Sequence, residues 1–183
     1  MIIKDRNELR DIIKYERELY IKKLYPNLGK KKVKNKTVIF MKSLRCIEFY
    51  ENKKKYLVNY AYWKTIYKVI SLITNISIPQ YVFDKGLIIM HLQNIVISSK
   101  VKVGENCCLF HNTTIGISMG KEQLGFCPQI ADNVTICTGA CVIGGIKISS
   151  DTVIAANAVV TKTFEETNVI LGGIPAKVIK LRT

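Results

Sequence analysis

The apolar residues of this chain follow two different periods, and the change falls near residue 75. Up to that point they recur every three or four positions, which predicts amphipathic helices. Asp5 followed by Glu8 resembles a capping box at the start of the first helix. Pro26, Asn27 and Gly29 are expected to end this helix, because such residues favour turns over helix continuation.

Two further helices are expected before residue 76. One runs roughly from Thr37 to Tyr50, and the other runs roughly from Tyr56 to Thr74. The spacing predicts an apolar face on each, formed by Phe40, Leu44 and Ile47 in the earlier helix and by Leu57, Tyr60, Ile66, Val69 and Ile73 in the later one. Arg45, Glu48 and Tyr50 are interpreted as packing or surface residues.

From Ile76 onward the apolar period becomes six. Neither an α-helix nor an alternating strand has this period, whereas coils with three flat faces do. The pattern therefore predicts a solenoid of parallel strands in which three hexads, 18 residues, make one coil. Four columns of inward positions follow this period: Phe83, Ile89, Ile95, Val101, Cys107 and Thr113; Ile97, Val103, Leu109 and Ile115; Ile130, Ile136, Val142, Ile148 and Ile154; and Val134, Ala140, Ile146, Thr152 and Ala158.

One break interrupts the hexads. Ile115 and Ile130 are fifteen positions apart, which is not a multiple of six. The segment at about 117–129 is therefore expected to leave the coil as a loop. A loop that leaves a rigid scaffold is a usual place for function, although an idle loop is the alternative.

The candidate chemistry centres on the two histidines, His91 and His111. They are 20 residues apart, one coil plus two residues, and are expected to lie near one another on adjacent coils. A neutral imidazole suits a general base, and a structural histidine is the alternative. No metal is expected, because two histidines cannot supply a three-histidine zinc site and the cysteines lack CxxC spacing.

Charge changes the picture mainly in the helical part. Residues 1–75 hold 19 basic and 7 acidic residues, a net charge of +12, whereas residues 76–183 hold 9 and 7, a net charge of +2. A solvated helical face, an anionic membrane surface or an anionic polymer would each account for the excess. Nucleic acid is not expected, because no binding motif accompanies the charge. Without a visible signal or spanning segment, the chain is expected in the cytoplasm, with its cysteines as thiols.

Several motifs make the stretch from Ile76 to Lys180 similar to the left-handed β-helical hexapeptide acyltransferases. The matching segments are GLIIMH at 86–91, LFHNTTIG at 109–116, CPQIADNV at 127–134, IAANAVVTK at 154–162 and GGIPAKVIK at 172–180. Within this class the chain resembles the serine acetyltransferase branch, especially bacterial polysaccharide O-acetyltransferases of the colanic-acid kind. The resemblance implies a mainly β protein: a left-handed parallel β-helix over residues 76–183 after an α-helical region over residues 1–75.

The resemblance also implies an activity and a site. It implies acetyl transfer from acetyl-CoA to a sugar hydroxyl of a surface or capsular polysaccharide or its precursor, within a homotrimer whose sites lie between subunits. His91 would be the general base, and His111 would be a second candidate base or a sugar-binding residue. Met90 and Phe126 would contact the acceptor. Coenzyme A would lie along the coil edge at Thr138, Ala156, Thr161, Lys162, Lys177 and Lys180.

Departures from the serine acetyltransferases favour the carbohydrate acceptor. Ile76 and Met90 stand where those enzymes have Asp, and Phe126 and Cys127 stand where they have an Arg-His pair. The carboxylate of free serine is naturally clamped by a cation, whereas Phe126 would pack on a sugar face. A serine O-acetyltransferase with an altered acceptor site and a non-catalytic β-helical scaffold are the alternatives. The basic N-terminal part would hold the enzyme near an anionic glycan or the inner face of the membrane.

Overall fold

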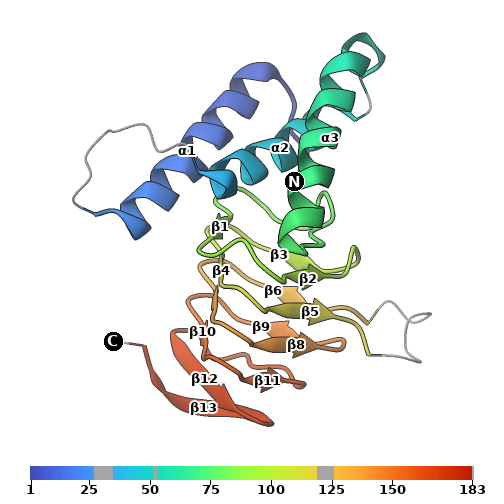
Figure 1. Ribbon diagram of the computed structural model, residues 1–183. Coiled ribbons are helices and arrows are strands. Elements are labelled where there is room, and N and C mark those ends of the chain that lie inside the picture. The colour runs from blue at the N-terminus through green and yellow to red at the C-terminus, as the bar shows by residue number, and fades with distance from the viewer. Residues whose placement is uncertain (27–34, 52, 119–125, 183) are drawn as a thin grey trace.

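The computed structural model describes residues 1–26, 35–51, 53–118 and 126–182. Three helices stand on one end of a triangular solenoid of short parallel strands (Figure 1). They are α1 (Arg6–Leu24), α2 (Lys36–Tyr50) and α3 (Leu57–Thr74), and the short 3-10 helix η1 (Lys54–Tyr56) leads into α3. Among the described helices, none combines the length and the apolar character needed to cross a bilayer.

The start of α1 is confirmed by its cap. The Asp5 carboxylate accepts hydrogen bonds from the backbone N–H groups of Asn7 at 2.8 Å and Glu8 at 2.9 Å. These groups have no partner within the helix, so the carboxylate stabilises its first turn. The helix ends at Leu24, shortly before Pro26. The other predicted stop residues, Asn27 and Gly29, lie outside the described residues.

The strands of the solenoid form three sheets, which confirms the left-handed parallel β-helix predicted from the hexads. The sheets are β1-β4-β7-β10-β12-β13, β2-β5-β8-β11 and β3-β6-β9, and only the pair β12-β13 is antiparallel. The strands are β1 (Ile88–Ile89), β2 (Val96–Ile97), β3 (Lys102–Val103), β4 (Cys108–Leu109), β5 (Thr114–Gly116), β6 (Gln129–Ile130), β7 (Thr135–Ile136), β8 (Cys141–Ile143), β9 (Lys147–Ile148), β10 (Val153–Ile154), β11 (Val159–Val160), β12 (Val169–Gly173) and β13 (Ala176–Leu181).

The predicted inward columns form the core of the solenoid. All their residues are at most 5% exposed, including Thr113 and Thr152. The two threonines satisfy their hydroxyl groups locally, since Thr113 Oγ1 donates to the Phe110 carbonyl at 2.7 Å and Thr152 Oγ1 donates to that of Ser150 at 3.5 Å. The apolar column continues through every coil because each coil covers the inward residues of the next.

Left-handed residues turn the chain at the corners of each coil. At the corner after the first sheet these are Asn94, Asn112, Gly139 and Asn157, with φ of 49°, 57°, 72° and 58°. Asn and Gly accept this conformation at the lowest steric cost. Their side chains also link coils, because the amide of Asn94 donates to Asn112 Oδ1 at 3.1 Å.

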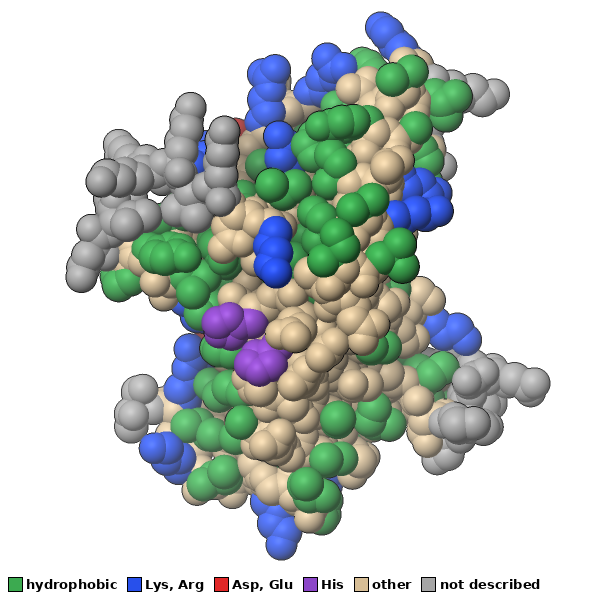
Figure 2. Space-filling view, in the orientation of Figure 1, with side chains coloured by type: hydrophobic (Ala, Val, Ile, Leu, Met, Phe, Trp, Pro, Cys, Tyr) green, Lys and Arg blue, Asp and Glu red, His purple; other side chains and the backbone are tan. Residues whose placement is uncertain are grey.

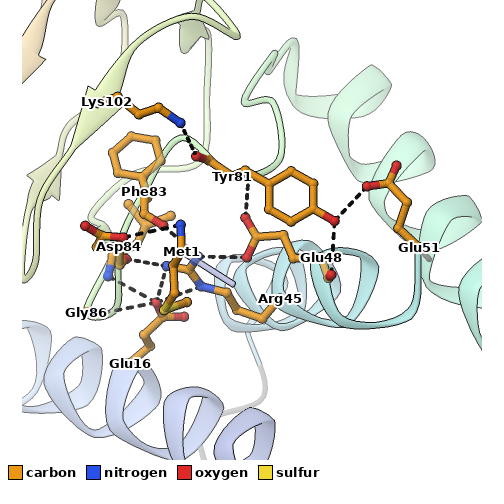
Figure 3. A network of polar contacts seen from close by, with 11 residues as sticks. Met1, Glu16, Arg45, Glu48, Glu51, Tyr81, Phe83, Asp84, Gly86 and Lys102 are labelled. Atoms are coloured by element: carbon orange, nitrogen blue, oxygen red, sulfur yellow. Dashed lines mark hydrogen bonds and ion pairs between the residues drawn. The ribbon is translucent and has the colours of Figure 1, made fainter. Parts of the chain in front are cut away.

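Arg45 joins the helices to the first coil (Figure 3). Its buried guanidinium donates to Glu16 at 2.7 and 3.0 Å and to Glu48 at 2.9 Å. It also donates to the backbone carbonyls of Phe83 at 3.0 Å and Asp84 at 2.6 Å, which belong to the solenoid. The sequence interpretation of Arg45 and Glu48 as packing or surface residues therefore missed a buried ionic link.

The apolar face predicted for the third helix is wrong. Leu57, Val69 and Ile73 are 69%, 47% and 77% exposed, while Ile66 and Tyr60 are half-buried. The inner side of α3 instead includes Tyr67, whose ring stacks on Phe40 at a centroid distance of 5.1 Å. The helix is apolar nearly all round, so spacing alone does not determine which side packs inward.

Candidate active site

The two histidines lie side by side at one corner of the solenoid. They follow β1 and β4, and Ile89 pairs with Leu109, so His91 and His111 occupy equivalent positions in adjacent coils. Their ring centroids are 5.4 Å apart, with the ring planes at 76°. Figure 2 shows both on the surface just below the helical part.

The expected offset of two residues between the histidines is corrected by the length of this coil. Ile88 pairs with Cys108, 20 positions later, whereas Val96 pairs with Thr114, 18 positions later. Two extra residues therefore lie between β1 and β2, at Leu92 and Gln93. A corner absorbs them without disturbing the strands on either side, because the corner carries no ladder hydrogen bonds of its own.

The two imidazoles differ in exposure. His91 is exposed, and its ring lies edge-on to Phe110 at a centroid distance of 6.2 Å. His111 is half-buried, and its Nδ1 atom is buried without a hydrogen-bond partner among the described residues. A buried polar nitrogen without a partner is costly in a purely structural role, so His111 is more than a packing residue.

The edge that carries the histidines continues through two of the predicted coenzyme A residues. Leu109 pairs with Ile136, and Ile136 pairs with Ile154. Thr138 and Ala156 therefore stack below His111, each two residues beyond its strand. Thr138 is half-buried and Ala156 is exposed. Their small side chains leave the backbone of this edge open to a close approach.

The other predicted coenzyme A residues lie at the far end of the solenoid. Thr161 and Lys162 follow β11, and the Lys162 ammonium lies 5.4 Å from the centroid of the Phe164 ring. Lys177 and Lys180 lie on β13, where they pair with Gly172 and Ile170 of β12. All four predicted residues are exposed.

Phe126 lies at a different corner from the histidines. It is 48% exposed and packs against Gly145 in the connection between β8 and β9, where a Cβ atom on that glycine would lie 2.5 Å from Phe126 Cβ. Met90, the other predicted acceptor residue, is half-buried directly before His91. One chain therefore does not bring the two together. Of the predicted loop, residues 119–125 lie outside the described residues.

The described residues contain no group of three or more His, Cys, Asp or Glu side chains that could hold a metal ion. All six cysteines are free thiols. Burial raises the pKa of Cys107 to about 12, because the thiolate would lose its hydration in the core. Cys107 thus acts as a small apolar core group and not as a metal ligand or nucleophile.

Comparison with known proteins identifies relatives of one kind. No family model matches the sequence. Serine acetyltransferase of Staphylococcus aureus is 35% identical over 130 residues, which are 70% of this chain and 58% of that protein. Serine acetyltransferase of Staphylococcus xylosus is 33% identical over 134 residues, 73% of this chain and 59% of that protein. The chain thus spans less than two thirds of these relatives.

Solved structures show the same fold. The crystal structure of serine acetyltransferase from Vibrio cholerae superposes with a TM-score of 0.78 at 17% identity, over 97% of this chain and 68% of that chain. Serine acetyltransferase from Brucella abortus, in complex with coenzyme A, superposes with a TM-score of 0.77 at 20% identity, over 97% of this chain and 70% of that chain.

These findings correct the expected acceptor. The sequence analysis favoured a polysaccharide O-acetyltransferase, whereas the relatives and the structural neighbours are serine acetyltransferases. The motifs in the β-helix do not distinguish the two, because they build the coils and the donor edge and not the acceptor pocket. The sequence relatives and the shared fold together support the serine acetyltransferase family of hexapeptide-repeat proteins as the family to which this chain is related.

Proposed function

We propose that this protein is a serine O-acetyltransferase that uses acetyl-CoA as acetyl donor. The observation that carries the proposal is the pair of imidazoles 5.4 Å apart at the head of an edge of small residues. Serine enters as acceptor from the activity named for the sequence relatives, and a structural neighbour is a complex with coenzyme A.

In the proposed reaction, acetyl-CoA supplies an activated acetyl group. His91 removes the proton from the serine hydroxyl as its oxygen attacks the thioester carbonyl, and returns the proton to the departing sulfur. General-base assistance of this kind contributes about 10²–10⁴-fold to the rate. We assign the base to His91 because its ring is exposed to an acceptor, and a positioning role to half-buried His111. Backbone N–H groups would stabilise the developing oxyanion.

We place coenzyme A along the edge below the histidines. Thr138 and Ala156 are stacked one coil apart, and small side chains there allow an extended pantetheine arm to lie against the backbone. Further along, Lys162, Lys177 and Lys180 would pair with the phosphates. Each lysine alone resembles an ordinary solvated side chain, so their value to the proposal comes from their common location at one end of the solenoid.

We also propose that the acceptor site lies between two copies of a homotrimer. Met90 precedes His91, while Phe126 lies at the next corner, so a site that uses both must take them from neighbouring chains. A triangular prism presents equivalent corners to copies around a threefold axis. Within such a site Met90 and Phe126 would line the acceptor side.

The test is acetyl-CoA turnover with L-serine, followed by release of free thiol. His91→Ala is expected to lower kcat at least about 100-fold, because it removes the base. Gln93→Ala is the matched control, since this exposed side chain occupies the same corner. Glycine, which lacks the hydroxyl, should support no turnover.

Two results would overturn the proposal. Absence of serine-dependent thiol release, with coenzyme A still bound in calorimetry, would exclude serine as acceptor. Absence of coenzyme A binding as well would favour a non-catalytic scaffold. Loss of turnover in His111→Ala but not in His91→Ala would keep the activity and transfer the role of base to His111.

A further inference from the structure

Helix α3 exposes a broad apolar face. Its outward apolar residues are Leu57, Val58, Tyr62, Val69, Leu72 and Ile73, and they are 47% to 82% exposed. At 3.6 residues per turn, these positions fall within one arc of about 160° together with Ala61, Thr65 and Lys68. Seven of the nine exposed residues in this arc are apolar. We call this set of nine residues the outer face of α3.

The outer face is not part of the core. The opposite side of α3 packs inward, where Tyr67 stacks on Phe40 and Thr74 is buried. Figure 2 shows hydrophobic side chains gathered over the helical part, with Lys and Arg side chains around them. Scattered apolar residues are normal on a protein surface, whereas a contiguous apolar face of this width indicates a binding surface.

Positive charge surrounds this face. Between Asn52 and Phe83 the sequence has five lysines and no acidic residue. Lys68 lies on the rim of the outer face, and Lys64 lies one turn earlier beside it. A second copy of the chain would bring like charges together at this face, which disfavours self-association. An anionic surface with an apolar interior would complement both the charge and the apolar arc.

We propose that α3 docks in the headgroup region of a membrane that contains anionic lipid. The apolar side chains, with Val58 and Leu72 the most exposed, enter the acyl boundary, and Lys64 and Lys68 remain among the headgroups. The helix lies in the plane of the interface and does not cross the bilayer. The docking does not depend on the proposed acetyl transfer.

Cosedimentation of the full chain with vesicles tests this proposal. The protein is expected to bind vesicles of phosphatidylcholine with about one third phosphatidylglycerol, and to bind pure phosphatidylcholine at least tenfold more weakly. Raising the salt concentration from 0.05 to 0.5 M is expected to weaken binding, because screening shortens the reach of the lysine charges.

Substitutions separate the apolar and the charged contributions. Val58→Gln combined with Leu72→Gln is expected to lower the partition coefficient at least tenfold, because two of the most exposed apolar side chains lose their burial in lipid. Lys64→Gln combined with Lys68→Gln is expected to reduce the preference for anionic lipid. Val96→Thr, at a 52% exposed valine on β2, is the matched control and should bind like wild type. Circular dichroism checks that each variant is folded.

Either of two results would overturn the proposal. The first is equal binding, or no binding, to anionic and neutral vesicles. The second is a change in the molar mass of the lipid-free protein when Val58 and Leu72 are replaced, measured by light scattering, because this would assign the outer face to a second copy of the chain.

Discussion

At the scale of single residues, Arg45 shows how a buried charge is stabilised. A guanidinium without water needs partners for its donors, and Arg45 finds them in two carboxylates and two carbonyls. The carboxylates of Glu16 and Glu48 in turn raise the pKa of Arg45, which keeps it charged. The same side chain fixes α1 and α2 against the first coil.

Replacing Arg45 tests this link. Arg45→Ala is expected to lower the free energy of unfolding by about 3–5 kcal/mol, because two buried carboxylates lose their counter-ion. Urea denaturation followed by circular dichroism measures the change. Arg10→Ala, on the exposed side of α1, is the control and should stay within about 0.5 kcal/mol of wild type. A loss as small as that of the control would contradict the assigned role.

Cysteine reactivity is a second prediction at this scale. Burial raises the pKa of Cys46 and Cys107 to about 12, and the thiolate is the reactive form. At pH 8 both thiols therefore stay protonated in the folded protein, and their reactivity increases only as the pH approaches 12. Iodoacetamide should leave both unlabelled in peptide mass spectra at pH 8, and should label both after unfolding in urea. Rapid labelling of Cys107 in the native protein would contradict its burial.

At the scale of elements, the corner asparagines set the path of the coil. Asn112 has φ of 57° and accepts a hydrogen bond from Asn94, so its backbone and its side chain both serve the corner after His111. The sequence shows only that Asn recurs. The left-handed backbone explains why, since Asn tolerates this conformation better than most residues with a Cβ atom.

Two substitutions at Asn112 separate these contributions. Asn112→Gly keeps the left-handed conformation and loses the side-chain hydrogen bond, worth about 0.5–1.5 kcal/mol. Asn112→Ala loses the bond and also places a poorly tolerated residue at positive φ, at a further cost of about 1–2 kcal/mol. Thermal or urea unfolding should therefore rank wild type above Gly and Gly above Ala. Equal stability of the two variants would show that the corner has no preference for Asn or Gly.

The hairpin β12–β13 carries a prediction for the donor site. Lys177→Gln combined with Lys180→Gln is expected to raise the KM for acetyl-CoA about tenfold or more and to leave kcat nearly unchanged. The lost charges would bind phosphates far from the reacting atoms, and so affect binding of substrate and transition state equally. Lys147→Gln, an exposed lysine on β9, is the control. Wild-type KM in the double variant would remove these lysines from the proposed site.

At the scale of the whole molecule, the triangular cross-section separates residues that a single pocket would need. The histidines and Phe126 lie at two corners of one chain, each rigidly held by the coils. Neither can move to the other without unwinding the solenoid. Assembly of copies around a threefold axis is the simplest way to bring the two corners together.

Mixing inactive variants tests the shared site. His91→Ala and Phe126→Asp chains are each expected to be inactive alone. After unfolding and refolding together in equal amounts, they should regain about one quarter of wild-type activity, because half of the chains supply each intact corner and the two combine at random. A mixture that stays inactive, with trimers present in light scattering, would show that both corners act from one chain or that Phe126 is outside the site.

The period of six by itself determined the solenoid, its inward columns and the closeness of the two histidines. This is possible because every coil repeats the same burial, so a local pattern specifies a global shape. The sequence pattern did not determine that the first coil has 20 residues, because a corner absorbs Leu92 and Gln93 without changing the hexads on either side. It also led to the wrong acceptor, because the shared motifs lie in the coils and on the donor edge.

Only the tertiary structure decided how the helices meet the solenoid. Arg45 finds Glu16 from another helix and carbonyls from the first coil, and no local pattern encodes partners so distant in sequence. The inner side of α3 is likewise selected by what α2 and the first coil place beside it, because a helix that is apolar all round can pack on either side. Periodicity thus defines the elements, whereas long-range contacts define which of their surfaces remain free to bind.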